Sequence, residues 1–125
     1  MQEHELWILY ASNDLETAKT SLREDNIYSS AFFLCQQCAE KALKAFLVFN
    51  QQLPPKIHDL MKLLKDCIKL DPEFINLKKD AEGLNPFIIT FRYPDMGLPF
   101  PDKTTLKITI EEAERILNFV RERLS

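Results

Sequence analysis

The chain has 125 residues, of which 46% are hydrophobic and 28% are charged, and its formal net charge is -3. This balance is typical of a single folded domain and excludes a disordered chain. The acidic charge also excludes a protein that coats duplex nucleic acid, which would need many uncompensated lysines and arginines.

No segment approaches the ~20 consecutive apolar residues of a membrane span, and the first five residues lack the basic start of a signal peptide. We therefore expect a cytoplasmic protein without membrane contact. Three cysteines in such a chain are expected to be reduced thiols. Cys35 and Cys38 form a CxxC pair, but they lie inside a helical pattern, so we interpret them as packed side chains and predict no redox or metal site.

Two helices are predicted in the first half of the chain. Residues 3–24 place apolar side chains at steps of three and four, from Trp7 to Leu22. Residues 27–52 contain no proline or glycine, and their apolar arc spans roughly 200° at ~100° per residue. One neighbouring helix cannot cover that arc. We expect other helices to wrap this one and the remaining apolar surface to bind a second copy, which predicts a homodimer.

The second half predicts three further helices. Leu53-Pro54-Pro55 should end the second helix, and the third is expected over residues 58–70. The fourth should start at Pro72 and continue past a kink at Asn85-Pro86 to about Phe91, followed by an irregular loop over residues 92–102. The fifth is expected to start near Thr109, with Thr109 and Glu112 as a capping box.

No credible strand pair is present, so the fold class is all-α. The prediction is one domain over residues 1–125. Its architecture is an antiparallel up-and-down helical bundle of four long helices and one shorter helix.

Polar side chains on the second helix form its one hydrophilic strip, which consists of Gln36, Gln37, Glu40, Lys41 and Lys44. The strip could be a solvated face with a Glu40–Lys44 ion pair. Alternatively, the lysines are partly buried and need a carboxylate or a bound phosphate. His58, at the start of the third helix, either caps and packs there or faces the strip as a functional imidazole.

The loop segment Arg92-Tyr93-Pro94-Asp95 also permits two interpretations. It could dock one end of the bundle, or it could clamp a nucleotide, with Tyr93 stacking on the base and Arg92 binding phosphate. No phosphate-binding glycine loop, GxSxG or HExxH motif is present, so no residue is assigned as catalytic and no cofactor is predicted. The candidate anion or nucleotide site comprises Gln37, Glu40, Lys41, Lys44, His58, Arg92, Tyr93 and Asp95.

Several stretches together resemble one known family, the HEPN domain. They are the AxxDLxxA spacing that starts at Ala11, the segment AFFLCQQCAEKALKAFL, the tetrapeptide IHDL that ends at Leu60, and FRYPD. QQxxEKxLKA and RYPD are the most specific parts. The resemblance implies an antiparallel helical bundle that is usually a homodimer.

The family's ribonuclease branch carries an arginine, four to six residues, and then a histidine. His4 has no arginine before it, and His58 would need an arginine at 51–53, where Gln51, Gln52 and Leu53 stand. Arg92 has no histidine after it. The ribonuclease motif is therefore absent.

The resemblance favours the family's non-catalytic branch, which is often encoded beside a small nucleotidyltransferase and is proposed to bind nucleotides. We expect a toxin–antitoxin-like binding module without chemistry of its own, with Lys41 and Lys44 at the phosphates and Tyr93 and Arg92 at the base or sugar. The alternative is a metal-independent ribonuclease with a divergent site and His58 as general base. A purely structural subunit is a third possibility.

Overall fold

The computed structural model describes residues 1–24, 28–88 and 102–124. Three helices of 21 residues each form its body: α1 (Glu3–Arg23), α2 (Ser29–Phe49) and α5 (Lys103–Arg123). The shorter elements are α3 (Leu60–Leu70), the 3-10 helix η1 (Pro72–Leu77), α4 (Lys78–Leu84) and the 3-10 helix η2 (Asn85–Ile88). No strand occurs in the described ranges. The all-α helical bundle is confirmed.

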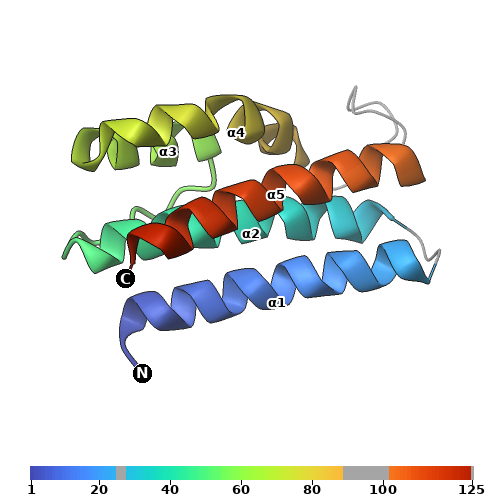
Figure 1. Cartoon of the computed structure of the whole chain (residues 1–125), viewed down its shortest axis with the longest axis horizontal. Helices are drawn as coiled ribbons and strands as arrows, with labels where there is room; N and C mark the ends of the chain where they lie inside the picture. The colour runs from blue at the N-terminus through green and yellow to red at the C-terminus, as the bar shows by residue number, and fades with distance from the viewer. Residues whose placement is uncertain (25–27, 89–101, 125) are drawn as a thin grey trace.

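Helix α2 lies at the centre of the bundle (Figure 1). It packs against α1 on one side and against α3 and η2 on the other, while α5 contacts α1, α2 and α4. Helices α1 and α2 are antiparallel, as are α4 and α5. Helices α2 and α3 run in the same direction because residues 50–59 return along the bundle before α3 begins. This returning segment brings His58 back beside the middle of α2.

The wide apolar arc of α2 is covered by helices of the same chain. Thirteen of its 21 residues are buried, and none of the exposed large hydrophobic side chains of the described residues lies on it. Wrapping by neighbouring helices is therefore confirmed. Four large apolar side chains of α2 remain partly exposed, namely Phe33, Leu34, Val48 and Phe49, and the homodimer stays a prediction.

Helix α2 ends at Phe49, before the proline pair that was expected to stop it. Gln51 adopts a left-handed conformation with φ 57°. The backbone N–H of Gln52 donates to the Leu47 carbonyl at 2.9 Å, and that of Gln51 donates to Val48 at 3.0 Å. These bonds form a Schellman motif, which satisfies carbonyls that the last helical turn leaves free.

Helix α5 starts at Lys103, so the predicted start near Thr109 is wrong. The Asp102 carboxylate caps the helix by accepting from the Thr105 backbone N–H at 2.7 Å, and this hydrogen bond lowers the pKa of Asp102. Thr109 lies inside the helix, where its hydroxyl donates to the Thr105 carbonyl at 2.9 Å. Aspartate is a strong cap, and it lies earlier in the chain than Thr109.

The predicted fourth helix is divided into η1, α4 and η2, and its expected end at Phe91 lies outside the described residues. The three cysteines are buried free thiols, as the packing interpretation predicted. Burial raises the pKa of Cys38 to about 12 and also raises those of Cys35 and Cys67. Among the described helices, none combines the length and apolarity that a membrane crossing requires.

Candidate functional site

Three polar residues at four-residue spacing lie on the buried side of α2. Gln36, Glu40 and Lys44 are 0%, 4% and 6% exposed. Side chains four residues apart share one face of a helix, so these residues form a single polar row within the bundle. A solvated face is therefore not the correct interpretation of this row. Buried polar groups require hydrogen-bond partners, and each of these has one.

The Glu40 carboxylate is the centre of a hydrogen-bond network. Lys44 Nζ donates to Glu40 Oε2 at 3.1 Å, and Gln37 Nε2 donates to Oε1 at 3.3 Å. Gln36 Nε2 lies 3.4 Å from the same Oε1. His58 Nδ1 lies 3.1 Å from both carboxylate oxygens. Ionised carboxylates have about four acceptor positions, so Glu40 can satisfy all four side chains.

His58 connects this network to the surface. Its side chain is 66% exposed, whereas the Glu40 side chain is 5% exposed. Its backbone carbonyl also accepts from Gln36 Nε2 at 3.0 Å, which ties the returning segment to α2. Since Nδ1 faces the buried carboxylate, Nε2 is the ring nitrogen that remains for an external partner.

The start of α3 holds His58 in place. The Asp59 carboxylate caps α3 by accepting from the Met61 backbone N–H at 2.9 Å. Asn85, on η2, accepts from the Leu60 N–H at 2.9 Å and donates to the Asp59 carboxylate at 3.2 Å. These bonds join the segment before α3 to η2, the element that follows α4. The His58 backbone is thereby fixed on two sides.

The two lysines of the strip are both paired with carboxylates. Lys41 Nζ lies 2.6 Å from Asp14 Oδ2 on α1, and both side chains are largely buried. Lys44 Nζ pairs with Glu40 and lies 5.8 Å from the centroid of the Trp7 ring, where a cation–π interaction adds to the ion pair. The sequence left open whether these lysines pair with a carboxylate or with a bound phosphate, and in the structure both pair with a carboxylate.

The structure brings together four of the candidate residues: Gln37, Glu40, Lys44 and His58. Lys41 faces α1 and belongs to a separate ion pair. Arg92, Tyr93 and Asp95 lie outside the described residues. Sequence reasoning missed Asp14 and Asn85 as partners, because their roles depend on which helices become neighbours. Trp7 was expected on the inner face of α1, but nothing in the sequence paired it with Lys44.

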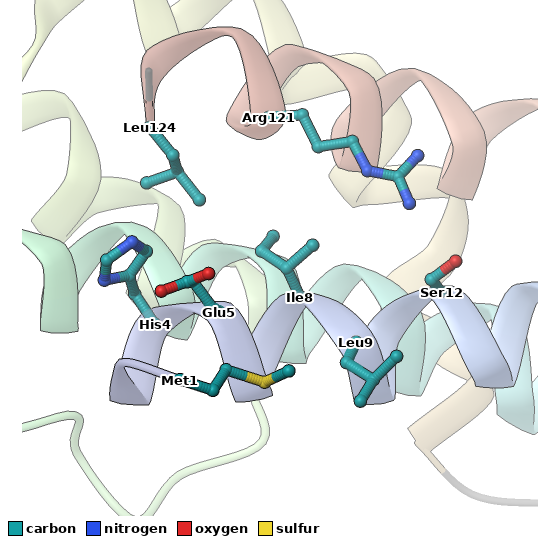
Figure 2. A pocket seen from close by; sticks show the side chains of 8 residues that line it. All are labelled: Met1, His4, Glu5, Ile8, Leu9, Ser12, Arg121 and Leu124. Carbon is teal, nitrogen blue, oxygen red and sulfur yellow. The ribbon is translucent and has the colours of Figure 1, made fainter.

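A groove lies between α1 and α5, apart from the Glu40 network (Figure 2). This groove has a volume of about 490 Å³ and is open to solvent on one side. Its lining residues are Met1, His4, Glu5, Ile8, Leu9, Ser12, Arg121 and Leu124. No residue of the Glu40 network lines the groove. Within the described part of the chain, no group of three or more His, Cys, Asp and Glu side chains could hold a metal ion.

Residues 4–123 match the family model described as the HEPN domain. The chain belongs to the HEPN domain family. The most specific part of its HEPN-like sequence, from Gln36 to Lys44, is the segment that builds the Glu40 network. The segment of α2 that is most specific to the family is therefore also the segment that contains the buried hydrogen-bond network around Glu40.

Individual relatives agree with the chain in length, and two solved structures agree with it in fold. The protein named "Putative toxin MJ1304" of Methanocaldococcus jannaschii is 28% identical over 131 residues, which cover 94% of this chain and 85% of that protein. The crystal structure of ST0689, an archaeal HEPN homologue, has a TM-score of 0.79 and 32% identity over the full length of both chains. The crystal structure of TT1696 from Thermus thermophilus has a TM-score of 0.82 and 30% identity, covering 99% of this chain and 100% of its own.

Proposed function

We propose that this HEPN protein is the toxin-like member of a cytoplasmic toxin–antitoxin pair. In this proposal it binds a nucleotide at the surface around His58, including a nucleotide presented by a nucleotidyltransferase partner, and performs no chemistry of its own. The single observation that supports the site is the exposed His58 ring whose Nδ1 is held by the buried Glu40 carboxylate. The toxin-like part is supported by the name of the relative "Putative toxin MJ1304".

The proposal divides the candidate residues by role. His58 donates from Nε2–H to a phosphate oxygen when it is an imidazolium, and its Nε2 accepts from a base N–H when it is the neutral Nδ1–H tautomer. Gln37 lies beside it in the same network. Glu40 holds the ring, and Lys44 neutralises Glu40. A lysine that is paired with a buried carboxylate is less available to a phosphate. Lys41 would have to leave Asp14 to bind one. Arg92, Tyr93 and Asp95 remain sequence-based candidates for phosphate and base contacts.

Calorimetric titration of ATP, GTP and CTP into the protein tests the proposal. We expect one of these nucleotides to bind, and we expect His58→Ala to weaken that binding by about tenfold, the usual effect of losing a charge-assisted hydrogen bond. His4→Ala is the matched control, since His4 lies on α1 with its ring against Phe49 and outside the network. Absence of binding to the wild type, or equal loss in both variants, refutes the site.

The Glu40–His58 geometry also favours a second candidate, metal-independent RNA cleavage. A carboxylate that holds Nδ1 leaves the Nε2 lone pair free to accept the proton of a ribose 2′-hydroxyl. The resulting alkoxide attacks the adjacent phosphorus and the bond to the 5′-oxygen breaks. The products are a 2′,3′-cyclic phosphate and a 5′-hydroxyl, whose oxygen takes its proton from water. Lys41 and Lys44 are both paired with carboxylates. Arg92 is therefore the residue that would stabilise the negative charge that develops on the phosphate oxygens.

Incubating RNA with the protein in excess chelator distinguishes the two candidates. Cleavage by the wild type and by His4→Ala, but not by His58→Ala, establishes the enzyme and contradicts the non-catalytic proposal. Intact RNA with all three proteins eliminates cleavage and leaves nucleotide binding to be decided by the titration.

A further inference from the structure

A half-buried carboxyl on α5 packs against the backbone of α4. Helix α4 lies along α5 (Figure 1), and Gly83 is the residue of α4 that meets the Glu112 side chain. A Cβ at Gly83 would lie 2.7 Å from Cδ of Glu112 and 2.9 Å from its Oε1, so only glycine fits there without displacing Glu112. Within the described residues, Glu112 makes no hydrogen bond or ion pair.

The charged and titratable groups around Glu112 do not compensate an ionised carboxyl. Asp80 lies one turn before Gly83 on α4 and adds a second negative charge. Arg115, on α5, donates to Asp80 Oδ1 from Nε at 3.0 Å and from Nη2 at 2.8 Å, so its charge is already paired. The Cys35 thiol of α2 stays neutral, because burial raises its pKa. Burial, followed by the charge of Asp80, therefore raises the pKa of Glu112 to about 7.

The end of α4 leads directly to the residue that holds the start of α3. No loop separates α4 from η2, which begins at Asn85. The Asn85 backbone N–H donates to the Ala81 carbonyl, so helical hydrogen bonding continues through Gly83. The Asn85 side chain accepts from the Leu60 N–H and donates to the Asp59 carboxylate. A displacement of Gly83 is therefore passed on to both side-chain bonds of Asn85.

Aromatic contacts on either side of α4 limit such a displacement to a local shift. The Phe87 ring of η2 lies 4.9 Å from the Phe32 ring of α2. The Phe74 ring of η1 lies 4.3 Å from the Phe46 ring, also on α2. Both neighbours of α4 are thus joined to the central helix. The fold is retained while α4 changes its distance from α5.

We propose that Glu112 regulates the His58 site through α4. While the Glu112 carboxyl is neutral, it packs against Gly83 and keeps α4 close to α5. When the carboxyl ionises, it requires hydration, and the water that enters the contact moves α4 away from α5. The hydrogen bonds of Asn85 then break more often, and the segment that carries His58 loses its fixed position.

The closed contact between Glu112 and Gly83 is favoured at low pH. It holds the Glu112 proton more tightly than an open contact, in which the pKa returns towards 4.5. Its preference is therefore complete below pH 4.5 and is lost as the pH rises to about 7. This inference rests on the proposed function only for its consequence, which is weaker ligand binding at the higher pH.

Solvent exchange of the Leu60 backbone amide, measured by NMR without ligand, reports the Asn85 bond. Leu60 is the first residue of α3, so its N–H has no acceptor within the helix. From about pH 6 to about pH 7.5, its protection factor should fall about threefold in the wild type and stay constant in Glu112→Gln. Glu111→Gln, which changes an exposed carboxylate of α5, should behave as the wild type. A constant wild-type value, or equal changes in wild type and Glu112→Gln, overturns the proposal.

Gly83→Ala tests the contact itself. The added methyl group displaces the Glu112 carboxyl into solvent, so the Leu60 protection factor should no longer change over this pH range. Glu82→Ala is the matched control, because Glu82 is an exposed residue of the same helix, and it should keep the wild-type pH dependence. A Gly83→Ala variant that keeps this dependence overturns the proposal.

Nucleotide titration separates the regulation from the proposed function. If a nucleotide binds, the ratio of the wild-type Kd to the Glu112→Gln Kd should rise about threefold between the same two pH values. Ionisation of the ligand or of His58 is common to both proteins and cancels in this ratio. A constant ratio overturns the regulation. Absence of nucleotide binding refutes the proposed function, and the exchange of Leu60 still decides whether Glu112 controls the Asn85 contact.

Discussion

Both carboxylate oxygens of Glu40 lie 3.1 Å from Nδ1 of His58. An ionised carboxylate accepts hydrogen bonds and cannot donate them, so the neutral imidazole should carry its proton on Nδ1. Nitrogen NMR of the wild type is expected to show this tautomer for His58. Glu40→Gln should weaken the preference, because the amide that replaces the carboxylate can donate to Nδ1. An Nε2–H tautomer in the wild type contradicts the geometry.

The same carboxylate neutralises a buried lysine, which predicts a large loss of stability for Glu40→Ala. The Lys44 and Glu40 side chains are 8% and 5% exposed. Removal of one partner leaves an uncompensated buried charge, so we expect a loss of about 3 kcal/mol in the free energy of unfolding. Urea unfolding followed by circular dichroism measures it.

Two further variants show whether the unpaired charge is the cause. Glu40→Ala combined with Lys44→Met removes both charges and should lose less stability than Glu40→Ala alone. Asp14→Ala breaks the more exposed Lys41–Asp14 pair and should cost about 1 kcal/mol, close to the range of partly exposed pairs. Equal losses for Glu40→Ala and Asp14→Ala would show that burial does not decide the cost.

The sequence was sufficient to predict the all-α class, the first two helices and the central position of α2, since apolar periodicity reports which faces must be buried. It left open whether Lys44 pairs with Glu40 or with a bound phosphate, and it could not show that His58 reaches Glu40, because that contact depends on the returning segment 50–59. The end of α2 at Phe49 was missed for a related reason. A Schellman motif needs a left-handed residue, and Gln51 is an uncommon choice for that position.

The strained position at Gln51 predicts a stabilising substitution. Gln51 has φ 57°, a conformation that costs a residue with a Cβ roughly 1 kcal/mol more than glycine. Gln51→Gly should therefore raise the free energy of unfolding by about 0.5–1 kcal/mol, with part of the gain offset by the flexibility of glycine in the unfolded chain. Thermal and urea unfolding measure the change.

The neighbouring residue supplies the control for this substitution. Asn50 has φ -94°, which needs no glycine, and its side chain donates to the Phe46 carbonyl at 2.8 Å. Asn50→Gly should therefore destabilise the protein. If both glycine variants change stability in the same direction, the backbone conformation of Gln51 is not the cause.

Buried thiols predict that the folded protein resists thiol reagents. The three cysteines are 0% exposed, and burial raises their pKa values, so little thiolate is available near neutral pH. We expect no reaction with a disulfide reagent in native buffer and reaction of all three thiols in denaturant. Rapid labelling of one thiol in native buffer would place that cysteine outside the core.

Glu112 predicts a pH dependence of stability. Its carboxyl packs against Gly83 of α4, where an added Cβ would lie 2.0 Å from Oε2. Burial, followed by the charge of Asp80, raises the pKa of Glu112 from 4.5 to about 7. Because the folded state then holds the proton more tightly than the unfolded chain, its contribution to stability is complete below pH 4.5 and is lost as the pH rises to about 7.

Glu112→Gln should remove this loss, which we expect to be on the order of 1 kcal/mol because the side chain is only half-buried. Urea unfolding of the wild type and of Glu112→Gln, below pH 4.5 and above about pH 7, measures how far the free energy of unfolding of each protein changes with pH. Glu111→Gln, an exposed carboxylate on the same helix, should leave the wild-type pH dependence unchanged. Parallel pH profiles for the wild type and Glu112→Gln would mean that Glu112 ionises in the folded protein as it does in the unfolded chain.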